Sequence, residues 1–223
     1  GIQSFGFTGF ENGLGGTADD VATIIGAGSI SGGTGIDLVS GLDTLRGGPA
    51  NNTFDVIGAA TVRVDGVSDV LAVDIMEGLG GDDTFTFNLI PIVPTFTSID
   101  GGTGTDTISG SPQGDGFTIT GPQSGNSIGT PFVGVEILDG MGGNDTFTFT
   151  VTPTAAGMAS FLGGAGTDSF VGSPGTETVT FTTATVGVLA GGASFSDLEH
   201  FSFGAGNDTL VLADGASPLS ADG

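Results

Sequence analysis

The sequence predicts an all-β fold: a right-handed parallel β-solenoid of about seven coils, with roughly 31 residues in each coil. Three observations lead to this prediction. Acidic positions recur every 30 to 32 residues, apolar residues keep the same register, and segments rich in Gly and Thr lack helical periodicity. An antiparallel β-sandwich is the alternative, but it would not require the same residue types to recur in every unit. We expect residues 1–223 to form one domain, either a whole subunit or a segment of a longer array.

The first observation is a pair of acidic series. The spacings of the first series are 32, 31, 32, 30, 32 and 31 residues, and the second series follows nine residues later. Every position holds Asp, Glu or Asn. The first series is Glu11, Asp43, Asp74, Asp106, Glu136, Asp168 and Glu199, and the second is Asp20, Asn52, Asp83, Asp115, Asp145, Glu177 and Asp208.

The second observation concerns the core. Apolar residues stand two and four positions after each member of the second series, as in the strand expected at 146–149, where Thr and Phe alternate with period two. These residues predict ladders of side chains up the core. The first ladder is Ala22, Phe54, Phe85, Phe117, Phe147, Val179 and Leu210, and the second is Ile24, Val56, Phe87, Ile119, Phe149, Phe181 and Leu212.

The charge balance narrows the range of partners. The chain has 25 acidic residues and only 2 Lys or Arg, for a formal net charge of −23. Nucleic acids and anionic membrane surfaces recruit Lys and Arg, so we expect neither as a partner. With no Cys, Lys or Tyr and a single His, a catalytic site is hard to build, and we expect no enzyme activity. Dissolved cations are the expected partners.

Stacked coils make the acids costly. If acids recur at every coil, like charges lie ~4.8 Å apart, and at an effective dielectric of ~20 each pair repels by about 3.5 kcal/mol. The carboxylates must then be protonated, turn into water or share cations. Calcium takes oxygen ligands at ~2.3–2.6 Å, whereas zinc and copper favour His or Cys. Calcium ions are therefore the predicted cofactor.

The glycine-rich segments resemble a known repeat. GGTGIDLVS (32–40), GGTGTDTIS (101–109) and GGAGTDSFV (163–171) are similar to the glycine- and aspartate-rich nonapeptide of the RTX, or haemolysin-type, calcium-binding proteins of bacteria. Weaker copies occupy 78–86, 110–118, 140–148, 172–180 and 203–211. The resemblance implies a β-roll-like fold in which the sixth residue and turn carbonyl groups hold calcium between stacked turns. Here the nonapeptides come in pairs separated by about 22 residues, unlike a long tandem roll.

The resemblance also implies a set of ligands. The sixth-position acids are Asp37, Asp83, Asp106, Asp115, Asp145, Asp168 and Asp208. Six further candidates belong to the acidic series or precede a sixth-position acid, namely Asp20, Asp43, Asp82, Asn144, Glu177 and Asn207. For Glu11, Asp74, Glu136 and Glu199, which lack a preceding run of glycines, a ligand and a solvated side chain are equally good interpretations.

The predicted function follows from these features. We expect a calcium-stabilised, extracellular structural module of a bacterial matrix, adhesin or surface filament, which associates end to end through uncapped strand edges. One alternative is a secretion-linked RTX module of a larger toxin or enzyme. Another is an ice- or surface-binding solenoid that uses outward Thr rows, although Asp55 and Val211 interrupt those rows.

Overall fold

The structure is a computed structural model. It describes residues 44–65, 73–88, 94–216 and 220–222 in full, and the backbone of 21–23, 36–37 and 68–71. The described residues are almost entirely strands and turns, with one short helix, α1 (Pro153–Ala156). The prediction of an all-β chain is confirmed. None of the helical structure in the described residues is long and apolar enough to cross a membrane.

The strands form two sheets that we call sheet A and sheet B. Sheet A contains, in spatial order, β1 (Val21–Thr23), β3 (Thr44–Arg46), β7 (Ile75–Glu77), β9 (Ser98–Asp100), β13 (Thr130–Val133), β12 (Ser124–Ser127), β11 (Gly116–Gly121), β15 (Thr146–Phe149), β17 (Ser169–Val171), β21 (His200–Ser202) and β23 (Ser220–Asp222). Sheet B contains β2 (Ile36–Asp37), β6 (Ser68–Leu71), β5 (Thr61–Val64), β4 (Thr53–Gly58), β8 (Thr84–Phe87), β10 (Thr107–Ser109), β14 (Ile137–Asp139), β16 (Ser160–Leu162), β20 (Ser194–Ser196), β19 (Gly187–Leu189), β18 (Thr178–Phe181) and β22 (Thr209–Leu212).

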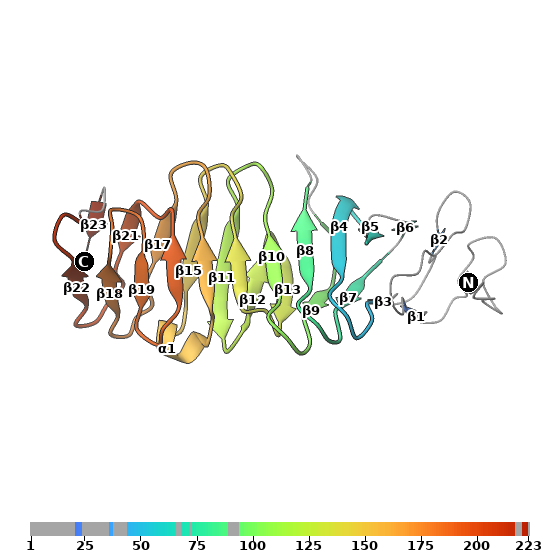
Figure 1. The fold of residues 1–223 in the computed structure, drawn as a ribbon, viewed down its shortest axis with the longest axis horizontal. Helices are drawn as coiled ribbons and strands as arrows, with labels where there is room; N and C mark the ends of the chain where they lie inside the picture. The colour runs from blue at the N-terminus through green and yellow to red at the C-terminus, as the bar shows by residue number, and fades with distance from the viewer. Residues whose placement is uncertain are drawn as a thin grey trace.

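The chain passes back and forth between the two sheets. A strand in one sheet is followed by a strand in the other, and strands that become neighbours in this way pair in parallel (Figure 1). At three places the chain makes an antiparallel meander before it crosses: β4–β5–β6 and β18–β19–β20 in sheet B, and β11–β12–β13 in sheet A. Both sheets are therefore rich in parallel pairs, and they advance together along the long axis of the molecule.

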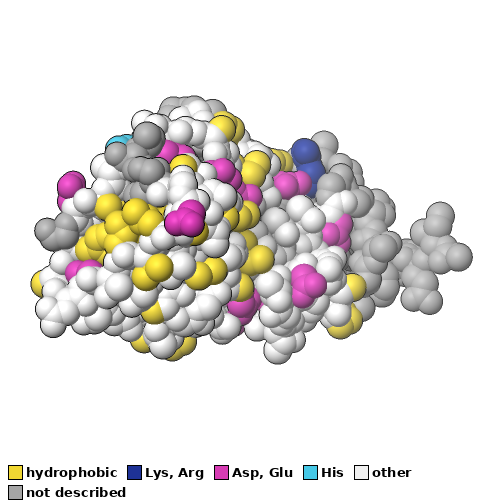
Figure 2. Space-filling model, turned by 60° about the vertical axis from the view of Figure 1, so that its left-hand side comes forward, with side chains coloured by type: hydrophobic (Ala, Val, Ile, Leu, Met, Phe, Trp, Pro, Cys, Tyr) yellow, Lys and Arg dark blue, Asp and Glu magenta, His cyan; other side chains and the backbone are white. Residues whose placement is uncertain are grey.

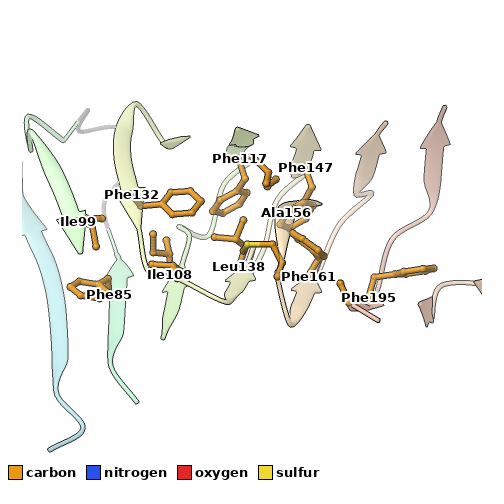
Figure 3. Packing of buried hydrophobic residues seen from close by; sticks show 14 of the residues in the cluster. Phe85, Ile99, Ile108, Phe117, Phe132, Leu138, Phe147, Ala156, Phe161 and Phe195 are labelled. Carbon is orange, nitrogen blue, oxygen red and sulfur yellow. The ribbon is translucent and has the colours of Figure 1, made fainter. Parts of the chain in front are cut away.

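Apolar side chains from both sheets fill the space between them. In β8 and β15, each with the sequence Thr-Phe-Thr-Phe, the Phe side chains are buried and the Thr side chains half-buried. Since parallel partners lie in register, equivalent Phe rings stack: the ring centroids of Phe54 and Phe85 are 4.7 Å apart, and those of Phe117 and Phe147 are 5.0 Å apart. Figure 3 shows Phe85, Phe117 and Phe147 among the buried side chains between the strands. The predicted core residues from Phe54 to Phe181 are all buried, as expected. Their predicted stacking order is right only in part, because Phe85 is followed in its sheet by Ile108, while Phe117 belongs to the other sheet.

The last rung of the predicted core is an exception. Leu210 and Leu212 pair in register with Val179 and Phe181, which are fully buried, yet they are 37% and 48% exposed. The reason is their place in β22, which is the outermost strand of sheet B among the described residues, so that no further described strand of this sheet covers them. Figure 2, with the C-terminal side of the molecule turned forward, shows hydrophobic surface there.

The predicted uniform period of about 31 residues is wrong. Neighbouring coils are joined by steps of 30 or 31 residues and, between Asp83 and Asp106 and between Asp145 and Asp168, by steps of 23 residues. The two step lengths have a structural cause. From Asn52 to Asp83 the chain makes the meander β4–β5–β6, whereas from Asp83 to Asp106 it makes only β8 and β9.

Candidate metal-binding site

The acidic residues at the starts of the strands form three rows, which we call ladders. In each ladder, the backbone N–H of one member donates a hydrogen bond to the side chain of the next member, in the neighbouring coil. The first ladder, before strands of sheet B, is Asn52, Asp83, Asp106 and Glu136. The second, before strands of sheet A, is Asp115, Asp145, Asp168 and Glu199, and the third is Glu177 and Asp208.

The hydrogen bonds within a ladder are short and use one carboxylate oxygen. The N–H of Asp83 donates to Oδ1 of Asp106 at 2.7 Å, and the N–H of Asp106 donates to Oε2 of Glu136 at 2.8 Å. In the second ladder, the N–H of Asp145 donates to Oδ1 of Asp168 at 2.7 Å. Each carboxylate thus fastens its own coil to the one before it.

In the ladders, a glycine five positions earlier makes room for the side chains of Asn52, Asp83, Asp106, Asp115, Asp145, Asp168 and Glu177. A Cβ atom added to Gly78 would lie 2.2 Å from Oδ2 of Asp83 and 2.4 Å from the carbonyl oxygen of Gly101 in the next coil. At Gly140 the corresponding distances are 2.2 Å to Oδ2 of Asp145 and 2.7 Å to the carbonyl oxygen of the next coil. The glycine therefore leaves a small space on which two oxygen atoms converge.

Five carboxylate oxygens of the described ladders are buried with no hydrogen-bond partner. One is Oε2 of Glu177, and the other four are the Oδ2 atoms of Asp83, Asp106, Asp145 and Asp168, whose side chains are all fully buried. A buried charged oxygen without a donor is costly, because it has lost its hydration without replacement. These four Oδ2 atoms, which we call the free oxygens, are the strongest indication of a cation-binding site among the described residues.

The pKa values of the four buried aspartates reflect the same cost of burying a charged oxygen. Burial raises the pKa of Asp145 to about 7 and that of Asp83 to about 6. The hydrogen bonds that they accept oppose this rise, and the adjacent carboxylates of Asp168 and Asp106 add to it. Burial likewise raises the pKa of Asp106 and of Asp168. Without a cation, these aspartates hold protons at a pH at which an exposed aspartate is ionised.

The predicted ligands fall into several groups. Asp83, Asp106, Asp145 and Asp168 carry the free oxygens, while Asp115, Glu177 and Asp208 are also ladder members. Asp82, Asn144 and Asn207 are exposed and lie in an outer row, where Oδ1 of Asp82 accepts from the N–H of Thr105 and Oδ1 of Asn144 accepts from the N–H of Thr167. Asp37 lies in β2 with only its backbone described, and Asp20 and Asp43 lie outside the described residues.

The predicted stacking of the acids is right for five of the nine consecutive pairs whose residues are described. Asn52 with Asp83, Asp115 with Asp145 and Glu177 with Asp208 are neighbours, as are Asp106 with Glu136 and Asp168 with Glu199. The remaining predicted pairs of the described residues, such as Asp83 with Asp115, belong to different ladders, because a step of nine residues crosses from one sheet to the other. Members of the two series therefore alternate within one ladder, as Asp83 and Asp106 do in the first. Asp145 belongs to the second ladder, beside Asp168.

Some members of the site were not assigned from the sequence. Glu136 and Glu199 end the first and second ladders and accept backbone N–H groups, which favours a structural role over an outward solvated row. Ser111 donates from both its N–H and its hydroxyl group to the carboxylate of Asp115. The sequence does contain a signal for the space that holds these side chains, namely a glycine that recurs five residues before the acid.

The site fits a hard cation better than a transition metal. Its free atoms are carboxylate oxygens with backbone carbonyl oxygens beside them, which are ligands that calcium accepts. Within the described residues there is no group of three or more His, Cys, Asp or Glu side chains placed to hold a metal ion. A cation bound here would therefore depend on carbonyl oxygens as well as carboxylates.

Comparisons with known proteins find no relative of this chain. No protein-family model, no curated protein and no solved structure matches the chain.

Proposed function

We propose that the protein is a calcium-stabilised structural module in which cations take the four free oxygens of the ladders. The observation that carries the proposal is that Oδ2 of Asp83, Asp106, Asp145 and Asp168 is buried with no hydrogen-bond partner. A bound cation neutralises adjacent carboxylates and replaces the hydration that burial removed. The donor set contains only oxygen, which favours calcium over zinc or copper.

The fold that we propose for this module is a right-handed parallel β-solenoid of the β-roll kind. Support comes from the regular passage of the chain between sheets A and B and from the parallel, in-register pairing of successive coils. Crossovers between parallel strands are right-handed in about 98% of cases, which favours that hand here. The ladders then run along the coils at the turns between the two sheets.

An extracellular setting suits such a module. Calcium modules that work outside cells bind with dissociation constants of about 10⁻⁴–10⁻³ M, where the ion is abundant. A net charge of −23 suits an environment rich in divalent cations, and the chain contains no Cys. With the resemblance of its nonapeptides to the RTX repeat, these features favour a bacterial matrix, adhesin or surface filament.

End-to-end association is part of the same proposal. β22 is an edge strand whose Leu210, Val211 and Leu212 are all exposed, and an exposed apolar edge is a template for pairing with another chain. The occupant that we propose is the terminal coil of a second copy, since a coil of the same repeat continues the sheet in register. Calcium would reduce the repulsion between two such acidic chains.

The test is removal of calcium. In 5 mM calcium we expect a far-UV circular dichroism spectrum typical of strands and a cooperative thermal transition. Addition of EGTA is expected to lower the midpoint strongly or to unfold the protein, and excess magnesium is expected to restore it only in part, since magnesium requires a more rigid octahedral site. An identical melting curve with calcium and with EGTA would contradict the proposal.

Electron microscopy of the same samples separates the structural role from a secretion module. Rods in calcium that disappear with EGTA are expected for the filament. Monomers that fold with calcium but never associate would favour the secretion-linked alternative.

A further inference from the structure

The turns that carry the ladder acids are of two kinds. Each turn runs for six residues, from the glycine that makes room for the side chain to the ladder residue itself. We call those with proline at the third position proline turns, and the others glycine turns. The proline turns are 47–52, 110–115 and 172–177, and the glycine turns are 78–83, 101–106, 140–145 and 163–168.

Equivalent positions of a glycine turn and a proline turn lie next to each other in the structure. A Cβ added to Gly142, in a glycine turn, would lie 3.9 Å from Cα of Pro112, and one added to Gly80 would lie 4.0 Å from Cα of Pro49. Pro112 and Gly142 are the third residues of their turns. The two kinds of turn therefore stack directly and can be compared position by position.

Two of the three proline turns, 47–52 and 110–115, satisfy their own ladder residue. In the turn 110–115, the N–H of Ser111 donates to Oδ2 of Asp115 at 2.5 Å and its hydroxyl group donates to Oδ1 at 3.2 Å. In the turn 47–52, the N–H of Gly48 donates to Oδ1 of Asn52 at 2.6 Å. In the turn 172–177, Ser173 donates to one oxygen of Glu177, whose other oxygen is unpartnered.

A glycine turn leaves its acid unsatisfied. All four Asp side chains of these turns are fully buried, and in each the Oδ2 atom has no partner. The second residue has a left-handed conformation in each of them: φ is 74° at Leu79, 97° at Gly102, 67° at Met141 and 90° at Gly164. This residue turns its peptide towards the next coil, where the carbonyl oxygen of Met141 accepts from the N–H of Ala165 at 3.0 Å.

The proline accounts for the difference. A residue that precedes proline is held in the extended region, so Ser111 keeps its N–H directed at Asp115. Leu79 and Met141 adopt a conformation that is strained for residues with a side chain, and such strain concentrates at functional sites. The strain at these two positions coincides with the free oxygens.

We propose that the four glycine turns bind cations and that the proline turns 47–52 and 110–115 replace the cation with their own N–H donor, whereas 172–177 keeps a free oxygen on Glu177. This inference rests on the proposed function, because it assigns that function's calcium to specific turns. The first and second ladders then share one composition, in which a self-satisfied residue, Asn52 or Asp115, is followed by two cation-binding aspartates and a closing Glu.

The experiment exchanges the turns while keeping every acid. Calcium binding is measured by isothermal titration calorimetry on the wild-type chain and on the double variant Met141→Ser with Gly142→Pro, which converts a glycine turn into a proline turn. We expect this variant to bind fewer ions than wild type although Asp145 is intact. Asp115→Asn is the matched control and is expected to bind the wild-type number.

The outcomes separate this inference from the proposed function. An unchanged ion number in the turn-exchange variant, or a loss of ions in Asp115→Asn, overturns the assignment while calcium binding itself stands. If the wild-type chain binds no calcium, the proposed function fails and the assignment fails with it. Should the turn-exchange variant not fold by circular dichroism, the reverse exchange, Ser111→Met with Pro112→Gly, is expected to bind more ions than wild type, and an unchanged number overturns the assignment.

Discussion

At the scale of single residues, the glycine before each acid is as necessary as the acid. The side chain of Asp145 folds back over Gly140, so that its Oδ2 occupies the place of a Cβ. The need for glycine here is steric and does not come from a positive φ, since Gly140 has none. The ladder turns thus combine a buried carboxylate with the residue that makes its burial possible.

This reasoning predicts the effect of one methyl group. Gly140→Ala places a Cβ 2.2 Å from Oδ2 of Asp145 and 2.7 Å from the carbonyl oxygen of Gly163. Overpacking of this kind costs about 1–3 kcal/mol. We expect a loss of that size in the free energy of unfolding, measured by urea denaturation in calcium. Gly116→Ala is the control, because nothing lies within 4 Å of its added Cβ; equal losses in the two variants would contradict the steric account.

At the scale of turns and strands, proton and calcium compete for the same oxygens. Because the folded pKa of Asp145 is about 7 and that of Asp83 is about 6, both above the value of about 3.9 in an unfolded chain, the protonated form favours folding. This contribution is fully present below about pH 4 and is lost as the pH rises through 6 to 7.

The calcium-free protein is therefore expected to melt at lower temperature at pH 7.5 than at pH 5. Calcium takes the place of the proton at pH 7.5, so the decrease is expected to be smaller in its presence. Thermal midpoints between pH 4 and 8, with EGTA and with calcium, give the comparison, and Asp145→Asn is expected to flatten the EGTA curve. A calcium-free midpoint that rises towards pH 7.5 would show that the buried aspartates do not titrate as described.

Most of the strands and of the buried core could be predicted from the sequence. The pairing of the acidic residues could not, for a physical reason. The alternation in 146–149 and the recurrence of Phe gave the strands and the core from Phe54 to Phe181. The two acidic series look uniform because the 23-residue step from Asp83 to Asp106, plus the nine residues from Asp106 to Asp115, nearly equals the 31-residue step that contains a meander. Spacing alone does not reveal which strands pair antiparallel, so the interleaving of Asp83 with Asp106 was missed.

The candidate site was predictable to a similar degree. The acids of the glycine turns were identified from their glycines, and four of them prove to be buried with a free oxygen. Asp115 matches the same pattern, but its oxygens are taken by Ser111, a contact that depends on the backbone direction at 111 rather than on residue type. Asp82, Asn144 and Asn207 adjoin the ladder acids in sequence, yet neighbouring residues of an extended chain point to opposite sides, and these three are exposed.

At the scale of the whole molecule, the exposed C-terminal edge makes the account of assembly testable. Leu212 lies in register with the buried Phe181, so a second copy that continues sheet B would bury it. Leu212→Lys would place a charge inside that interface and is expected to abolish association, while its present exposure of 48% makes it tolerable in a monomer.

The control for assembly is on the same strand. Val211 pairs with Thr180, on the face of sheet B that is turned away from the core. In Val211→Lys the added charge therefore remains in solvent. Sedimentation velocity in calcium is expected to show large species for wild type and Val211→Lys, and monomers for Leu212→Lys. Equal association of the three proteins would mean that the edge of β22 is not the interface.

The central claim is that cations occupy the free oxygens, and the most direct measurement is a crystal structure of the protein grown with calcium. The account predicts anomalous difference peaks in contact with Oδ2 of Asp83, Asp106, Asp145 and Asp168. Water or no density at those four atoms, with calcium only at exposed acids such as Asp82, would contradict it.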